Sequence, residues 1–376
     1  MKNFENFTLG LFFTRDISLE KWYKQGIFKR EIKLYEKLSL HFKHIYLFTY
    51  GNQNDLKLKR LLPKNISIIP KKIPMNSTLY SVLLPLLNWK LLRKIDIYKS
   101  NQLDGAWTAA ISKLIFKKNY LNRSGYILSL FQSESGSGLF KNIITKILEK
   151  FSLISADQIE IASKRDLYYL KKNLKLKNKN ININPNFVDI NLFKNKDLKK
   201  LENSIVYVGR LEKQKNLFSL INAISNTKFE LHLIGEGNLK EELIKHAQQK
   251  NSNVIFEGYI VNEEIPNFIN KFEVFILPSY YEGMPKSLIE AMACGLPVIG
   301  TRVKGIKELI YNNKNGILCD LDSNSIKKAI INLMENQELK KRLGKNASLF
   351  IKDNFSFEKI YKNEIIILNK MIREKN

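Results

Sequence analysis

The second half of the chain alternates short apolar runs with amphipathic segments. The runs are almost continuously apolar, which is typical of strands buried on both faces. Helices are predicted between them at Leu217–Asn226, Leu239–Gln249 and Lys286–Ala293. This alternation of strands and helices predicts a parallel sheet covered by helices on both faces. The predicted strands are Ile205–Gly209, Phe229–Gly235, Val254–Gly258, Val274–Pro278, Leu296–Gly300 and Ile317–Asp320.

The first half repeats this plan less regularly. A long helix is predicted at Phe28–His41, after the first strand. The segment Leu139–Phe151 carries apolar residues at helical spacing, and this stripe predicts a helix that packs on the core. The apolar run Leu79–Leu92 precedes two basic residues and is compatible with a membrane surface. The predicted strands are Phe7–Phe13, His44–Thr49, Ile66–Ile69, Asp96–Ser100, Tyr120–Asn122 and Gln158–Ser163.

The chain is predicted to form two α/β domains of similar size. Lys, Asn and Asp replace apolar residues near 191–203, which indicates a junction between residues 1–190 and residues 191–356. A final helix is predicted within 357–376, packing back on the N-terminal domain. Ligands of such sheets bind beyond the carboxyl ends of the strands, so a cleft between the two domains is the expected active site.

The composition excludes a disordered, collagen-like or coiled-coil chain. Of 376 residues, 44% are apolar and 26% charged, as in globular domains. Two cysteines and four histidines leave little for a disulfide framework or a metal site. We expect no signal peptide, because the polar N-terminus is followed by too short an apolar run. We expect no membrane span, because no apolar stretch approaches about 20 residues.

The net charge is +26 and unevenly distributed. Residues 1–190 hold 33 Lys and Arg against 14 Asp and Glu, a net charge of +19, whereas residues 191–376 carry +7. The first half should therefore be attracted to anionic surfaces such as nucleic acid, acidic lipid or a diphosphate. No nucleic-acid-binding signature accompanies the charge.

The segment from Ser279 to Ala293 contains the most specific candidate binding site in the sequence. Gly283 permits a close-approaching backbone, and Pro285 suits the first position of the predicted helix. The backbone amides of residues 284–287 then face the carboxyl edge of the sheet, where they form an anion site. The carboxylates of Glu282 and Glu290 flank this site, and sugar or ribose hydroxyls are their expected partners. The alternative is a helix-start charge and a solvated helix residue.

A second basic segment follows the first strand of this half. Arg210 and Lys215 lie on the loop and helix start after Val206–Gly209. A planar guanidinium and a point-charge ammonium together suit a diphosphate. The alternative for these two residues on their own is a solvated basic turn.

These residues resemble the retaining glycosyltransferases of family 4, the glycogen-synthase-like group with the GT-B fold of two Rossmann-like, doubly wound domains facing across a cleft. Glu282 and Glu290 match the group's E-x7-E motif, and Gly209–Lys215 matches GRLxxxK. Leu233–Leu239, with Gly235, matches IGxGxL. The similarity covers residues 153–360, and Phe187 stands where the family's PNGVD motif has Gly.

The resemblance implies a role for each matched residue. Glu290 would hold the ribose hydroxyls and Glu282 the transferred hexose. Arg210 and Lys215 would neutralise the diphosphate, so that neither a metal nor a cofactor is expected beyond a UDP- or GDP-linked sugar. The remaining donor-binding residues would be Gly235, Tyr259, Ile260, Gly283, Met284, Pro285, Lys286, Ser287 and Leu288.

The first domain departs from the family pattern. Arg123 and Ser124 stand where the family often has a His-Asp pair, and we predict a catalytic role for Arg123. Gly26, on the loop after the first strand, is predicted to approach the donor, although a helix-start turn explains it equally.

The sequence thus predicts a retaining hexosyltransferase of bacterial surface polysaccharide or lipopolysaccharide synthesis. Its expected partners are a nucleotide sugar, a glycan or lipid-linked acceptor and an anionic membrane surface, with no nucleic acid. Its expected location is the cytoplasm or the inner face of the plasma membrane. The alternatives are a nucleotide-sugar 2-epimerase or phosphate-acceptor synthase of the same architecture, and a nucleic-acid-binding protein suggested by charge alone.

Overall fold

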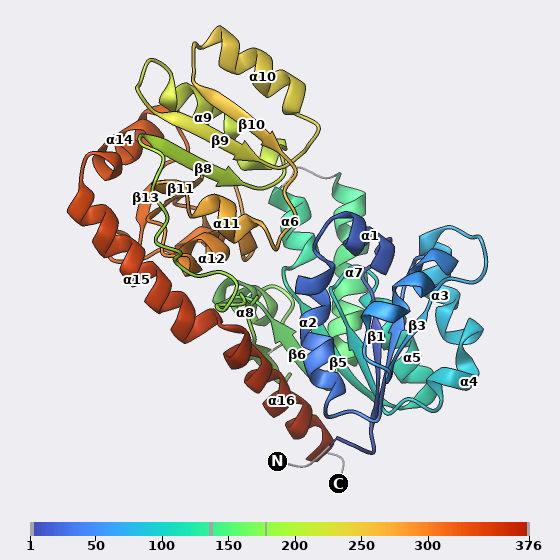
Figure 1. The fold of residues 1–376 in the computed structure, drawn as a ribbon. Helices are drawn as coiled ribbons and strands as arrows, with labels where there is room; N and C mark the ends of the chain where they lie inside the picture. The colour runs from blue at the N-terminus through green and yellow to red at the C-terminus, as the bar shows by residue number, and fades with distance from the viewer. Residues whose placement is uncertain (1–3, 135–137, 177–178, 374–376) are drawn as a thin grey trace. The chain divides into compact units, whose positions relative to one another are not determined.

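The chain folds into two compact α/β units. The computed structural model describes residues 4–134, 138–176 and 179–373. The first unit comprises Met1–Pro185 with Tyr361–Asn376, and the second comprises Asn186–Ile360 (Figure 1).

The first unit is built on a seven-stranded sheet in which every pairing is parallel. The strand order is β3-β2-β1-β4-β5-β6-β7. The last strand was not predicted, because Ile181–Ile183 is short and alternates Ile with Asn in a Lys- and Asn-rich region. The strands are β1 (Thr8–Phe12), β2 (His44–Phe48), β3 (Ile66–Ile69), β4 (Ile97–Ser100), β5 (Asn119–Ser124), β6 (Gln158–Ile161) and β7 (Ile181–Ile183).

Helices α3, α5 and α7 form one layer of this unit, since α3 packs against α5 and α5 against α7 (Figure 1). Their bounds are Ser77–Leu87, Ala106–Phe116 and Leu139–Ser155. The other helical segments that begin in this unit are α1 (Leu19–Lys24), α2 (Phe28–Ser39), the 3₁₀ helix η1 (Gln53–Leu61), α4 (Trp89–Leu92), α6 (Leu128–Glu134) and α8 (Lys164–Lys172).

The second unit is built on a six-stranded parallel sheet in the order β10-β9-β8-β11-β12-β13. The strands are β8 (Ser204–Val208), β9 (Glu230–Ile234), β10 (Val254–Gly258), β11 (Val274–Leu277), β12 (Val298–Thr301) and β13 (Ile317–Cys319). The helical segments are η2 (Lys213–Lys215), α9 (Leu217–Ile224), α10 (Lys240–Gln249), α11 (Ile265–Ile269), α12 (Lys286–Ala293), α13 (Lys304–Lys307), α14 (Ser323–Met334) and α15 (Gln337–Phe355). The last helix, α16 (Phe357–Arg373), begins in this unit and continues into the first.

In each sheet the order of the strands changes direction at the first strand, so that later strands are added on its other side. In the second unit β8 lies between β9 and β11, and in the first unit β1 lies between β2 and β4. The carboxyl ends of such neighbours are where doubly wound sheets bind ligands. The two doubly wound parallel sheets confirm the predicted fold class.

A buried charge cluster attaches α16 to the first sheet. Glu364 of α16 pairs with Lys99 of β4, and Glu160 of β6 lies 3.3 Å from the same ammonium. All three side chains are almost completely buried. Burial and the neighbouring Glu160 raise the pKa of Glu364. This cluster explains why α16 from Tyr361 onward is part of the first unit.

Helix α7 corrects one prediction. Its apolar stripe was predicted to pack on the core, but Phe140, Ile143, Ile144 and Ile147 are all exposed. Periodicity shows that apolar residues share a face of a helix, and it does not show which way that face points.

Candidate functional site

Two loops at the carboxyl ends of β8 and β11 form the centre of the candidate site. They are held together by hydrogen bonds between residues far apart in the chain. The side-chain amide of Gln214 donates to the carbonyl oxygen of Tyr281 at 2.8 Å, and the Tyr280 amide donates to the Gln214 carbonyl oxygen at 2.9 Å. The two predicted motifs are therefore one structural feature.

Lys215 and Glu282 meet inside this feature. The Lys215 ammonium lies 2.6 Å from Oε1 of Glu282, and the hydroxyl of Ser279 donates to the same oxygen at 2.6 Å. The Lys215 side chain is 13% exposed and that of Glu282 is 7% exposed. Because both charges are largely removed from water, their attraction is much stronger than that of a surface pair. The carboxylate is consequently held in a fixed position at the edge of the sheet.

Helix α12 begins beside this pair and has the predicted bounds. Pro285 lies just before the first helical residue, with ψ at 111°, instead of occupying the first helical position. The first amides of the helix are therefore those of Lys286, Ser287 and Leu288, and Met284 lies outside it. The amides in the first turn of an α-helix form the positive end of its dipole.

The residues around the helix start differ in what they can offer a ligand. The Leu288 side chain is fully buried in the core, so only its backbone can take part. The carbonyl oxygen of Met284 accepts a hydrogen bond from the side chain of Asn186 at 3.0 Å. That bond fixes the turn between Glu282 and the helix, and it uses the oxygen rather than the amide of Met284.

Glu290 lies inside α12 and is connected to a third loop. Its side chain is 5% exposed, and Oε1 accepts a hydrogen bond from the side-chain amide of Asn262 at 3.1 Å. Asn262 follows β10, on the loop that also carries Tyr259 and Ile260. The ring of Tyr259 is exposed. Glu290 is therefore held in place by the loop that carries two of the predicted donor-binding residues.

Glycines allow the backbones of this edge to approach one another. Gly235 has φ at +135°, and a Cβ atom there would lie 2.0 Å from the carbonyl oxygen of Gly209. A Cβ atom on Gly305 would lie 2.2 Å from the carbonyl oxygen of Gly283. A larger residue at either position would have to displace a loop of the site.

Arg210 shares the loop of Lys215 but not its burial. Its guanidinium lies 2.9 Å from Glu212, and the side chain is 64% exposed. Its carbonyl oxygen accepts a hydrogen bond from the buried hydroxyl of Tyr207 at 2.9 Å. Burial, and then the charge of Glu282, hold the pKa of Tyr207 well above its usual value. The backbone of Arg210 is fixed while its side chain lies at the surface.

The site residues predicted in the first unit lie on other elements. Arg123, near the end of β5, donates to the carbonyl oxygen of Asn184. Gly26 lies between α1 and α2 with φ at +51°, where its amide donates to the Tyr23 carbonyl oxygen at 2.9 Å. The roles predicted for Arg123 and Gly26 stay predictions.

The site residues that were not predicted include Gln214, Asn262 and Ser279. Ser279 opens the segment that carries both glutamates, and its position directly after a predicted strand was an available signal. Gln214 and Asn262 gave none, because an isolated amide in a loop has no pattern that reveals its partner.

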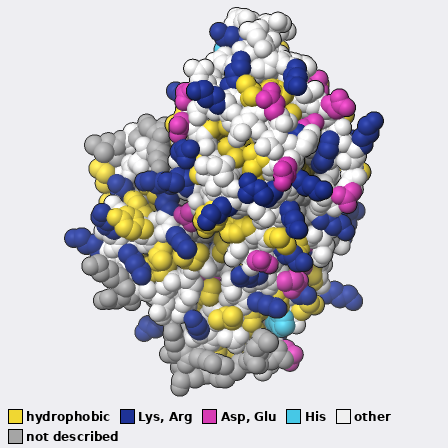
Figure 2. Space-filling model, turned by 90° about the vertical axis from the view of Figure 1, so that its left-hand side faces the viewer, with side chains coloured by type: hydrophobic (Ala, Val, Ile, Leu, Met, Phe, Trp, Pro, Cys, Tyr) yellow, Lys and Arg dark blue, Asp and Glu magenta, His cyan; other side chains and the backbone are white. Residues whose placement is uncertain are grey.

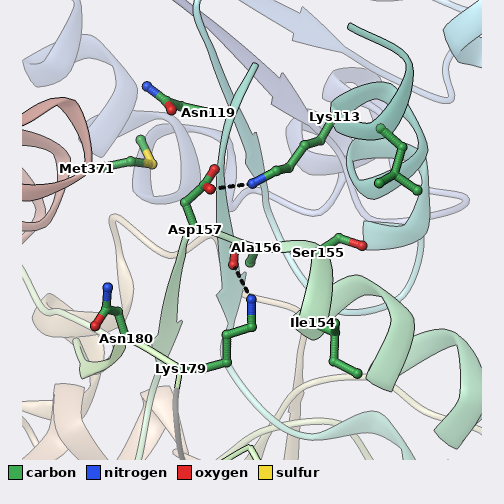
Figure 3. A pocket seen from close by; sticks show the side chains of 10 residues that line it. Lys113, Asn119, Ile154, Ser155, Ala156, Asp157, Lys179, Asn180 and Met371 are labelled. Carbon is green, nitrogen blue, oxygen red and sulfur yellow. Dashed lines mark hydrogen bonds and ion pairs between the residues drawn. The ribbon is translucent and has the colours of Figure 1, made fainter. Parts of the chain in front are cut away.

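A pocket of about 570 Å³ lies at the amino-terminal edge of the first sheet (Figure 3). It is lined by residues of α5, α16 and the end of α7, and by residues at or just before the starts of β5, β6 and β7. Lys113 pairs there with Asp157, and the Lys179 ammonium donates to the carbonyl oxygen of Ala156 at 3.1 Å (Figure 3). Lys113 neutralises a carboxylate, and Lys179 bonds the carbonyl end of α7. Both lysines therefore have structural roles in this pocket.

The described residues offer neither a metal cluster nor a membrane span. Residues 4–134, 138–176 and 179–373 include no group of three or more His, Cys, Asp or Glu side chains suited to a metal ion. No helix in these ranges is both long and apolar enough to cross a membrane.

The sequence matches known glycosyltransferases. Residues 189–350 match the family model described as glycosyl transferases group 1. An uncharacterised glycosyltransferase of Methanocaldococcus jannaschii is 33% identical over 62% of this chain and 65% of its own length. A Campylobacter jejuni N-acetylgalactosaminyltransferase, named for a diphospho-undecaprenol substrate, is 32% identical over 54% of this chain and 57% of its own. The chain thus spans less than two thirds of both relatives.

Solved structures share the fold across nearly the whole chain. Sucrose-phosphate synthase from Thermosynechococcus elongatus has a TM-score of 0.79 at 19% identity, covering 98% of this chain and 100% of that one. Anabaena HepE, solved in complex with UDP, has a TM-score of 0.77 at 16% identity, covering 97% and 100%. The chain is thus similar in sequence to glycosyltransferases, and it shares its fold with these two solved proteins.

Proposed function

We propose that the protein transfers a hexose from a nucleoside diphosphate sugar to a glycan or lipid-linked acceptor, with retention of anomeric configuration. The observation that carries this proposal is the largely buried pair of Lys215 and Glu282 at the start of α12, with Glu290 inside the same helix. This arrangement offers cationic, anionic and amide groups to which a diphosphate, a sugar and a ribose would each bind.

The donor diphosphate would lie against the start of α12. Lys215 has three N–H donors, so it can bond Glu282 and a phosphate oxygen at once. The amides of Lys286 and Ser287 and the exposed guanidinium of Arg210 would supply further positive potential. Each charged hydrogen bond contributes about 1.5–3 kcal/mol.

The two glutamates would then bind hydroxyl groups. Glu290, held by Asn262, would accept from the ribose, and Glu282 would accept from the hexose. The exposed ring of Tyr259 offers a stacking surface for the base. HepE was solved with UDP, which makes a UDP-linked sugar the first donor to test and a GDP-linked sugar the second.

The proposed chemical step needs no protein base. The acceptor oxygen would bond to the anomeric carbon on the face from which the diphosphate leaves, as the bond between that carbon and the phosphate oxygen breaks. The departing diphosphate would take the acceptor proton. Lys215 and Arg210 would neutralise its charge, so the step is proposed to be metal-independent.

The acceptor is proposed to be lipid-linked and presented at an anionic membrane surface. The names of two relatives, from Campylobacter jejuni and Escherichia coli, describe transfer to sugars on diphospho-undecaprenol. The positive charge of residues 1–190 suits such a surface. The proposed reaction would thus belong to surface polysaccharide or lipopolysaccharide synthesis, on the inner face of the membrane.

Product analysis tests the proposal. The protein is incubated with UDP- and GDP-sugars and a short-chain diphospholipid-linked sugar, and the product is examined by NMR. We expect one donor to yield a glycoside with the donor's anomeric configuration. An inverted product would overturn retention, and a 2-epimerised nucleotide sugar formed without acceptor would overturn transfer.

A further inference from the structure

Helix α7 buries three polar side chains and exposes a stripe of apolar side chains. Asn142, Glu149 and Ser152 are buried, whereas Phe140 is 78% exposed and Ile147 is 62% exposed. Two of these buried residues hold α6 in place. Oε1 of Glu149 accepts from an amide of α6, and Asn142 donates to a carbonyl oxygen of the same helix. A surface helix normally shows the opposite arrangement. The outward stripe is therefore not explained by core packing.

The neighbouring helices of the same layer carry further exposed apolar side chains. α3 packs on α5 and α5 packs on α7, so the three helices share a layer, and α4 packs on α3. Twelve exposed large hydrophobic side chains lie on these four helices, and large exposed apolar patches mark interaction surfaces. We name these residues the apolar helix face: Leu79, Val82, Leu86, Leu87, Trp89, Leu114, Ile115, Phe140, Ile143, Ile144, Ile147 and Ile154.

Basic residues accompany the apolar helix face. Lys146 and Lys150 are exposed on α7, and further exposed basic residues lie on and just after α4. The sequences of α3, α4, α5 and α7 contain a single acidic residue, the buried Glu149. On the face drawn in Figure 2, by comparison, basic side chains are spread among acidic ones. The apolar helix face is thus complementary to an anionic surface.

We propose that the apolar helix face docks on an anionic phospholipid bilayer. Apolar side chains enter the interface while lysines reach the headgroups. A second copy is a poorer occupant, because it would bring two basic surfaces together. The proposal rests on the membrane partner proposed above and adds the surface that makes the contact.

Vesicle sedimentation tests this surface in the full chain. The vesicles contain phosphatidylglycerol and phosphatidylcholine. One double variant combines Ile143→Ser with Ile147→Ser. The other combines Lys146→Glu with Lys150→Glu. Each pair should weaken binding about tenfold or more. The effect of the charge reversal should diminish at high salt, because salt screens exposed charges.

Matched control variants lie on α15, which carries exposed residues of the same types away from the apolar helix face. Leu349→Ser removes an exposed apolar side chain, and Lys341→Glu with Lys345→Glu reverses two exposed charges. Both controls should bind the vesicles as the parent protein does. The isoleucine variant should keep its thermal midpoint within about 2 °C of the parent, since it replaces exposed side chains.

Three outcomes would overturn the proposal. Equal vesicle binding by the variants and the parent would show that the apolar helix face does not make the contact, while a membrane partner would still stand. If the parent protein does not bind the vesicles, both the membrane partner and this docking surface are wrong. A concentration-dependent dimer that is lost in the isoleucine variant would assign the face to a second copy. Nucleotide binding, measured on the same variants, tests the transferase function separately.

Discussion

Replacing Lys215 by Met should lower the stability of the second unit. Met keeps most of the aliphatic stem but removes the ammonium from Glu282, whose side chain is 7% exposed. Removing one partner of a buried pair costs about 3–5 kcal/mol. For a unit of this size each kcal/mol lowers the thermal midpoint by about 2–4 °C, so a fall of roughly 6 °C or more is expected.

A double-mutant cycle isolates the pair. Glu282→Gln alone leaves a buried ammonium, whereas Lys215→Met with Glu282→Gln removes both charges and should recover at least half of the loss. Thermal unfolding is measured for all four proteins. A Lys215→Met variant as stable as the parent, or a double variant less stable than both single variants, would refute the reasoning.

Further predictions concern the glycine contacts, Arg210 and Glu149. Gly235→Ala should cost about 2 kcal/mol or more, because its Cβ would meet the Gly209 carbonyl oxygen, whereas Gly138→Ala, with nothing within 4 Å, should cost little; thermal unfolding compares them. Arg210→Ala should leave stability within about 0.5 kcal/mol yet weaken nucleoside diphosphate binding, and calorimetry showing equal loss for the nucleoside alone would count against it. Burial raises the pKa of Glu149 in the folded protein, so its ionisation opposes folding as the pH rises above the ordinary value of 4.5 through the folded pKa. Glu149→Gln should therefore gain stability relative to the parent as the pH rises through this range, and a difference independent of pH would contradict this.

Much of the fold follows from local pattern, and the site follows in part. Apolar runs located β8 and β11 because buried parallel strands need apolar side chains on both faces. The motifs located Lys215 and Glu282, but not their contact, which depends on the packing of two loops. The hydrogen bond between Asn262 and Glu290 could not be predicted, because nothing in the local sequence of Asn262 indicates that it contacts Glu290.

The errors share a physical cause. The stripe on α7 gave the right helix but the wrong environment, since periodicity carries no information about what covers a face. Pro285 was assigned to the first helical position by its usual preference, whereas the loop geometry places it just outside the helix. Tertiary packing decided both cases.

The central claim is that the edge of the second sheet binds a nucleoside diphosphate through α12. Calorimetric titration of the parent protein, Glu290→Ala and the exposed control Glu338→Ala with UDP and GDP tests it most directly. We expect one nucleotide to bind the parent and the control alike, and Glu290→Ala to bind about tenfold or more weakly. Equal affinity in Glu290→Ala, or no binding of either nucleotide to the parent, would contradict the account.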